Sequence, residues 1–124
     1  QIKSAKDVVD ILMPQMRDLK KEVFKVVFLN SQNRIIAIED LEQGTVNHAA
    51  PIIREIFQRA LQHFAVSIIC VHNHPAGEVH PSDEDKTFTQ KLVESGKTLG
   101  IKVLDHIILG SNGSYSFEDE KLMG

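Results

Sequence analysis

The chain has 124 residues, of which 42% are hydrophobic and 25% charged, which predicts one soluble globular domain over residues 1–124 with a sizeable core. Its formal net charge at pH 7 is −3 and its longest basic run is Lys20-Lys21, so we expect this domain not to bind nucleic acid directly. The single cysteine, Cys70, excludes an internal disulfide and suits a cytoplasmic protein, and no apolar run reaches transmembrane length, so we expect no membrane association.

The first predicted element is a helix that begins after Ser4. Ser4 and Asp7 have the spacing of a capping box, in which two side chains satisfy the free amides of a helix N-terminus. Pro14 is expected to end or kink this helix, because proline lacks an amide hydrogen and clashes with the preceding turn. The apolar residues that follow the cap at helical spacing are Val8, Ile11 and Leu12.

A β-hairpin is predicted next. Residues 22–29 are mostly apolar and rich in aromatic and β-branched side chains, as strands are, and Glu22 is their first residue. Residues 30–33 form the turn, and residues 34–38 return as the second strand. Position alone makes Glu22 a solvated residue at the start of a strand.

A second helix is predicted from Ala49 to Phe64, after a loop at Gly44-Thr45 and with Asn47 as its cap. Arg54 lies off its apolar face, where we expect a solvated side chain; the alternative is that it holds the Gly44-Thr45 loop or a substrate carboxylate. The expected buried stripe consists of Ile53, Ile56, Phe57, Ala60, Leu61 and Phe64.

The central part of the chain is predicted to be a buried strand, a polar loop and a long helix. Residues 65–71 are an apolar run of strand length. The helix is expected from Asp83 to Leu99, and Gly100 suits the residue that ends it in a left-handed conformation. Its expected core residues are Phe88, Leu92, Val93 and Leu99.

Two histidines and a carboxylate flank the polar loop. His72 and His74 stand two residues apart on an extended chain, so their side chains point the same way, and Pro75 keeps His74 extended. Asp85, in the first turn of the next helix, can fold back over the loop. Two imidazoles and one carboxylate make three ligands, the number that a catalytic zinc typically takes from the protein while it keeps a fourth position for water. The plainer alternative is that the histidines cap a strand end and that Ser82 and Asp85 form only a capping box.

The chain is predicted to end with strands at residues 101–109 and 114–117, joined by a turn at Ser111-Asn112-Gly113. Asp105 and His106 interrupt the first of these apolar strands and need hydrogen-bond partners. We expect one of them to orient a metal ligand or loop by a hydrogen bond, without binding the metal itself; the alternative is a purely structural hydrogen-bonded pair. The order of elements predicts an α/β domain with a mixed β-sheet packed between helices.

The spacing of His72, His74, Ser82 and Asp85 resembles the JAMM metalloprotease motif of JAB/MPN domains. Asn73 and the segment Leu104-Asp105-His106-Ile107-Ile108 are similar to the bacterial RadC branch, whose members carry a "DNA repair" name. Similarity also extends to Gly44-Thr45, Arg54-Glu55-Ile56-Phe57 and Ser114-Tyr115-Ser116-Phe117, and runs from about Ser4 to Phe117.

This resemblance implies a cytidine deaminase-like architecture and Zn²⁺ held by His72, His74 and Asp85. It also implies that Glu22 is the general base, a choice that position alone does not make among the four glutamates upstream of the histidines. RadC-like chains usually carry Ser where Ala76 stands, and eukaryotic deubiquitinating members carry Ser or Thr where Asn73 stands, which weakens the expectation of a ubiquitin-type substrate. Full-length relatives have an N-terminal helix-hairpin-helix region, so we expect this chain to be a fragment.

The function expected from this resemblance is hydrolysis of a peptide or isopeptide bond by water that the metal activates. Glu22 would take the proton from that water, and Ser82 would donate a hydrogen bond to the developing oxyanion. Two alternatives stay open, a metal nuclease and a non-catalytic JAB-like scaffold in a DNA repair or recombination complex. A zinc nucleoside deaminase is excluded because its Cys-x-x-Cys ligands need more than one cysteine. The substrate and the oligomeric state stay open.

Overall fold

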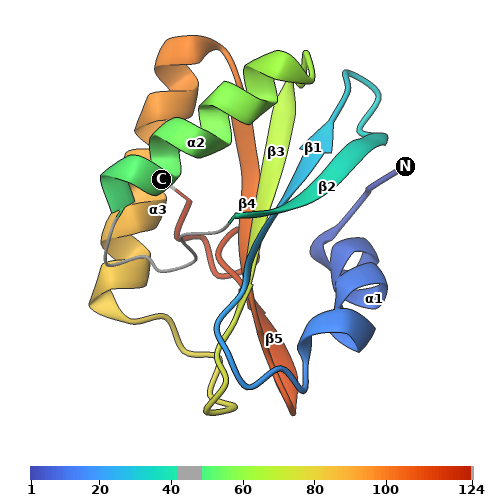
Figure 1. The fold of residues 1–124 in the computed structure, drawn as a ribbon, viewed down its shortest axis with the longest axis vertical. Helices are drawn as coiled ribbons and strands as arrows, with labels where there is room; N and C mark the ends of the chain where they lie inside the picture. Colours follow the sequence, from blue (N-terminus) through green and yellow to red (C-terminus); the bar gives the residue numbers. More distant parts are fainter. Residues whose placement is uncertain (42–48, 124) are drawn as a thin grey trace.

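The computed structural model describes residues 1–41 and 49–123, which form three helices and one five-stranded sheet (Figure 1). The order of strands across the sheet is β2-β1-β3-β4-β5. The elements are α1 (Ala5–Met16), β1 (Phe24–Leu29), β2 (Ile35–Leu41), α2 (Ala49–Gln62), β3 (Ser67–Asn73), α3 (Asp83–Leu99), β4 (Lys102–Gly110) and β5 (Gly113–Ser116).

The sheet is mixed, as the order of elements predicted. Strand β1 pairs antiparallel with both β2 and β3, and β4 pairs antiparallel with β5. Strands β3 and β4 are parallel, and α3 supplies the crossover that a parallel pair requires. Strand β3 is therefore central, and the loop that follows it leads directly into α3.

Helices cover both faces of this sheet (Figure 1). Helix α1 packs on one face through Val8, Leu12 and Met16, which form one buried cluster with side chains of β1, β3 and β4. Helices α2 and α3 cover the other face, where their buried residues, Ile52 and Phe88 among them, pack against β1 and β3. The predicted α/β architecture with a mixed sheet between helices is confirmed.

Local signals at the helix ends are confirmed for α1 and α3. Ser4 is the N-cap of α1, and the Asp7 carboxylate accepts a hydrogen bond from the Ser4 amide at 3.2 Å. Helix α3 has the predicted bounds. Ser82 caps its start, and Gly100 ends it with a φ of 74°, a left-handed conformation that glycine adopts without strain.

Some predicted details of the helices are wrong. Helix α1 continues past the exposed Pro14 and ends at Met16, so the proline does not end the helix itself; a proline two residues from the last helical residue removes few helical hydrogen bonds. The buried face of α2 is formed by Ile52, Ile56, Phe57 and Ala60. Leu61, which was predicted to be buried, lies outside this face and is 55% exposed. Phe64 lies beyond the helix end with a φ of 54° and is 88% exposed. In the same way Ile11 and Leu99 are 40% and 47% exposed, and they face solvent rather than the core.

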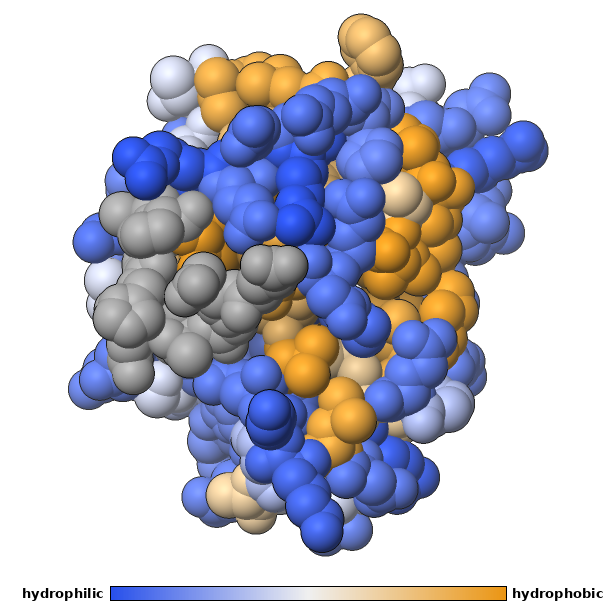
Figure 2. Space-filling view, viewed as in Figure 1, coloured by the Kyte–Doolittle hydropathy of each residue, from blue (hydrophilic) through white to orange (hydrophobic). Residues whose placement is uncertain are grey.

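Several strands differ from their predicted bounds. Strand β3 extends two residues further and carries His72 and Asn73, whereas β1 begins at Phe24, so Glu22 precedes it. Strand β2 runs on to Leu41 at the edge of the sheet, and Ile35 and Ile36 are 38% and 40% exposed on it. Figure 2 shows an apolar surface area on the side of the molecule where β2 and α1 lie.

Two sequence predictions fall outside the described residues: the Gly44-Thr45 loop and the Asn47 cap. Arg54 is exposed, as expected for a solvated side chain on the outer face of α2. In the described parts of the chain, none of the helices has the length and apolar character needed to cross a lipid bilayer.

Candidate metal centre

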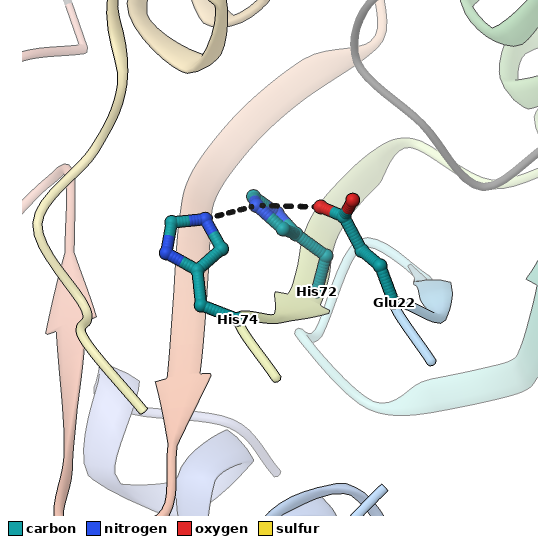
Figure 3. Close-up of side chains that lie close together, drawn as sticks. All are labelled: Glu22, His72 and His74. Atoms are coloured by element: carbon teal, nitrogen blue, oxygen red, sulfur yellow. Dashed lines mark hydrogen bonds and ion pairs between the residues drawn. The ribbon is translucent and has the colours of Figure 1, made fainter. Parts of the chain in front are cut away.

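The candidate site lies where β1, β3 and α3 meet. His72 is near the end of β3, directly opposite Phe24 of β1, so Glu22 comes to the same end of the sheet. His74 follows β3, and Asp85 lies in the first turn of α3. Figure 3 shows the side chains of Glu22, His72 and His74 pointing toward one another.

Four polar side chains converge on one point. The Nε2 atom of His72 lies 3.1 Å from Nε2 of His74, 3.3 Å from Oδ1 of Asp85 and 3.5 Å from Oε1 of Glu22. The Nε2 atom of His74 lies 3.3 Å from Oδ2 of Asp85. Ligand atoms of Glu22, His72 and His74 all lie within 4.8 Å of one another. The chain thus brings together the three side chains predicted as ligands and the one predicted as base.

A chain of buried hydrogen bonds sets the proton positions on His72. The Thr89 hydroxyl donates to the Asp85 carbonyl oxygen at 2.8 Å, so it must accept from Nδ1 of His106, 2.6 Å away. A neutral His106 then has its lone pair on Nε2, which lies 2.8 Å from Nδ1 of His72. His72 therefore donates from Nδ1, and the lone pair of its own Nε2 points into the site.

His74 reaches the same state by a different contact. Its Nδ1 atom lies 2.8 Å from the carbonyl oxygen of Glu78, which can only accept. Nδ1 therefore carries the hydrogen, and a neutral His74 also directs the lone pair of Nε2 into the site. Two imidazole lone pairs and the carboxylates of Asp85 and Glu22 are four acceptors around one point. Such a group could hold a metal ion, and two imidazoles with a carboxylate are a donor set of the kind that zinc accepts.

In the metal-free site, burial and the neighbouring side chains shift the pKa values of Asp85, His74 and Glu22. Burial alone would raise the pKa of Asp85. When the histidines are protonated at Nε2 instead of binding a metal, their hydrogen bonds to Asp85, together with that of the Ser82 amide, outweigh burial and hold this pKa far below its ordinary value. The hydrogen bond with Asp85 raises the pKa of His74, so a proton takes the cation's place. Burial raises the pKa of Glu22, which makes this carboxylate the better proton acceptor of the two.

His106 is held neutral. Its side chain is fully buried, and burial together with the neighbouring His72 lowers its pKa well below 6.5. This state is the one that the hydrogen-bond chain requires, since a protonated His106 could not accept from His72. Asp105 and His106 were the two residues predicted to orient a metal ligand. Of the two, His106 is the one that contacts a candidate ligand, His72.

Asp105 contacts a different part of the molecule. Its carboxylate accepts hydrogen bonds from the Ser116 hydroxyl at 2.5 Å, the His106 amide at 2.7 Å and the Glu118 amide at 3.0 Å. Burial raises its pKa in spite of these three donors. Asp105 therefore ties β4 to β5 and to the turn that follows, which corresponds to the structural alternative.

Ser82 has the capping role that its position predicted. Its hydroxyl oxygen accepts from the Asp85 amide at 3.0 Å, and its own amide donates to Oδ2 of Asp85 at 2.8 Å. These two bonds place the Asp85 carboxylate over the histidines. The Ser82 hydroxyl hydrogen is left to donate, and the residue lines the cleft described next.

An open cleft of about 460 Å³ lies beside the cluster, and its lining includes Glu22, His74, Ser82 and Asp85. Exposed Glu78, Glu84 and His80 line its outer part. Among the described lining residues there is no lysine or arginine. The cleft is thus acidic and gives a substrate direct access to three of the four converging side chains, Glu22, His74 and Asp85, while His72 is fully buried behind them.

Two polar residues of this region were not predicted from sequence. Thr89 is buried one helical turn after Asp85, and a small polar residue within the apolar face of α3 was the available signal. Asn73 is 1% exposed, and it donates to the Lys21 carbonyl and accepts from the Val23 amide, partners that are 52 and 50 positions away in the sequence. Only the strand order places these groups together.

Comparison with known proteins gives a consistent result. The sequence profile described as "RadC-like JAB domain" matches residues 2–122. A UPF0758 protein from Alkaliphilus metalliredigens is 47% identical over 123 residues, which are 99% of this chain and 53% of that protein. UPF0758 proteins from Caldanaerobacter subterraneus and Methanosarcina mazei are 49% and 45% identical over 96% and 97% of this chain, and 51% and 52% of their own lengths. The chain spans about half the length of these curated relatives.

Proposed function

Because the chain belongs to the RadC-like JAB domain family, we propose that it is a metal-dependent hydrolase that cleaves a peptide or isopeptide bond. The observation that carries this proposal is the convergence of four acceptors, with the Nε2 lone pairs of His72 and His74 directed at one point 3.1 Å apart. When both imidazoles are neutral, neither places a hydrogen between the two Nε2 atoms, so a metal ion fits between them, and the adjoining cleft gives a substrate access to it.

We assign His72, His74 and Asp85 as the ligands and Zn²⁺ as the ion. Asp85 is the third ligand rather than Glu22 because it contacts both Nε2 atoms, is 1% exposed and stays ionised. Two imidazoles and a carboxylate are a common catalytic zinc set. When bound, the ion would lower the pKa of a water molecule toward neutrality and polarise the substrate carbonyl.

The remaining residues of the site then have separate roles. Glu22, with its raised pKa, accepts a proton from the attacking water and returns it to the leaving amine. Ser82 donates its hydroxyl hydrogen to the oxygen that gains negative charge, while the same hydroxyl keeps the cap of α3. His106 holds the His72 ring in the orientation and tautomer that a metal ligand needs.

The charge of the cleft favours an amide substrate over a nucleic acid. Glu78 and Glu84 at the rim, together with Glu22 and Asp85 inside, would repel a phosphodiester backbone. The scaffold alternative leaves the buried acceptor cluster without a purpose, since an unused site has no reason to keep four acceptors facing one point.

The metal content of the purified chain tests the proposal. Elemental mass spectrometry on protein prepared without added metal is expected to find about one zinc ion per chain in the wild type and none in His74→Ala. A panel of peptides and isopeptide-linked peptides would then be tested for cleavage. No zinc in the wild type, even after dialysis against zinc, would overturn the metal assignment. Zinc without any cleavage would overturn the hydrolase and favour the scaffold.

A further inference from the structure

Asn73 lies between the two candidate histidine ligands but on the other side of the strand. Successive side chains of a strand alternate between its faces, so Asn73 points away from His72 and His74, toward the face that α1 covers. It is 1% exposed. Its Nδ2 atom donates to the Lys21 carbonyl oxygen at 2.9 Å, and its Oδ1 atom accepts from the Val23 amide at 2.6 Å.

The orientation of this amide group is determined by its partners. A flipped side chain would set its carbonyl oxygen against the Lys21 carbonyl and its NH₂ group against the Val23 amide, two repulsive pairs. The two backbone groups that it binds come from the residues immediately before and after Glu22. Asn73 therefore forms hydrogen bonds to the backbone on both sides of Glu22.

The sheet itself does not hold this segment. The pairing of β1 with β3 ends at Phe24 and His72, and the next available amide of the β3 chain, that of His74, donates instead to Leu109 of β4 at 2.9 Å. Among the described contacts, those of Asn73 are the only hydrogen bonds from another element to the backbone of residues 20–23. The two hydrogen bonds of the Asn73 side chain thus take the place of the next backbone hydrogen bonds between β1 and β3, which are not formed.

We propose that Asn73 is a positioning residue that fixes Glu22 relative to the two histidines. The inference rests on the proposed function, in which Glu22 is the base. Asn73 shares its peptide bonds with His72 and His74, so its two hydrogen bonds connect the base to both ligands through one short rigid unit. A displacement of about 1 Å in a catalytic group can cost 100-fold in rate, so such a link has a large effect.

Other residues at this position could not make both contacts. An aspartate would accept from the Val23 amide but would set an oxygen against the Lys21 carbonyl. A serine or threonine hydroxyl is too short to bridge two backbone groups on either side of one residue. Only the asparagine amide offers a donor and an acceptor at the required separation.

The test uses the zinc-loaded chain with Asn73→Ala, the isosteric Asn73→Asp, and Asn30→Ala as the matched control. Asn30 accepts two backbone hydrogen bonds, from Gln32 and Arg34, in the turn at the other end of β1. The control therefore also removes two hydrogen bonds between a side chain and the backbone, but far from Glu22. The first readout is amide hydrogen exchange by NMR, with the rate at Val23 divided by the rate at Val26. We expect this ratio to rise at least tenfold in Asn73→Ala and to stay unchanged in Asn30→Ala, with about one zinc ion per chain in all variants.

The second readout is turnover of a substrate found in the cleavage panel. Asn73→Ala and Asn73→Asp are expected to lower kcat at least tenfold with little change in KM. In a Glu22→Gln background, Asn73→Ala should cause no further loss, because it acts through Glu22. Losses that multiply in the double variant would show a general structural role and overturn the proposal.

The two readouts separate the two possible failures. An unchanged exchange ratio at Val23 overturns the role of Asn73 whether or not the protein is a hydrolase. If the ratio rises and zinc is bound but no substrate is cleaved, Asn73 holds the segment as inferred, and the assignment of Glu22 as a base fails with the proposed function.

Discussion

The Nε2 atom of His106 lies 2.8 Å from the Nδ1 atom of His72 and joins β4 to the candidate metal centre. The His106 ring also stacks on Phe117, with ring centroids 4.7 Å apart and planes 6° apart. Its Nδ1 atom contacts the Thr89 hydroxyl. Every polar atom of the ring is therefore used, and the orientation of a candidate ligand depends on the packing of the C-terminal part of the chain.

Replacement of His106 by phenylalanine should weaken zinc binding. His106→Phe keeps an aromatic ring against Phe117 but removes the acceptor for the Nδ1 hydrogen of His72. Loss of such an outer partner typically costs about 10- to 100-fold in metal affinity, which a competition titration with a coloured chelator measures. The control is His63→Phe, since His63 packs on Phe28 and contacts Glu39 away from the site. Equal affinity in His106→Phe and wild type would contradict the assigned role.

His106 should also make the metal-free chain sensitive to acid. Burial lowers its pKa well below 6.5, so at a pH below about 6.5 the unfolded chain binds a proton that the folded chain does not. The stability present above that pH is therefore lost as the pH falls, by about 1 kcal/mol per pH unit. Urea unfolding at about pH 7.5 and about pH 5.5 measures the effect as the difference between wild type and His106→Phe.

The comparison of the wild type with His106→Phe removes the contribution of His74, which changes stability with pH in the opposite direction. The pKa of His74 is raised by its hydrogen bond with Asp85, so His74 adds stability at low pH that is lost as the pH rises through its folded pKa. His74 is present in both proteins, and the difference between them isolates His106. A wild type that loses no more stability than His106→Phe on acidification would contradict the prediction.

The parts of the site that were predicted from sequence depend on local spacing. His72 and His74 share one side of an extended segment, and the capping box at Ser82 and Asp85 sets the carboxylate at a helix start. Both are relations over two or three residues, so no knowledge of the fold is needed. The same reason explains why the bounds of α3 were predicted in full from its two caps.

The parts that were not predicted depend on the strand order. His106 was predicted only as one of two residues that could orient a ligand, and its contact with His72, across 34 residues of sequence, forms because β3 and β4 are parallel neighbours. Asn73 reaches Lys21 across 52 residues because β1 is antiparallel to β3. Hydrophobic periodicity predicts that these strands exist but not which ones are neighbours. Glu22 was singled out by the family resemblance alone, and the structure places its carboxylate 3.5 Å from Nε2 of His72.

Glu22→Gln should separate metal binding from turnover. The amide keeps the size of the side chain but cannot accept a proton, so we expect about one zinc ion per chain and a loss of turnover of about 100- to 10,000-fold. Glu94→Gln on the exposed surface of α3 is the control and should match the wild type. Parallel loss of zinc and turnover in Glu22→Gln would make Glu22 a ligand instead of the base.

Ser82→Ala should reduce both stability and kcat, and a variant of the N-cap of α1 distinguishes the two effects. Loss of the hydroxyl that accepts from the Asp85 amide is expected to lower the free energy of unfolding by about 1 kcal/mol, the usual cost of an N-cap. Loss of the donor to the developing oxyanion should lower kcat by about 100- to 1,000-fold. Ser4→Ala removes the N-cap residue of α1, away from the site, and should reduce stability without reducing kcat. If Ser82→Ala loses stability as expected but keeps the wild-type kcat, Ser82 is a cap alone and the oxyanion donor must come from another group.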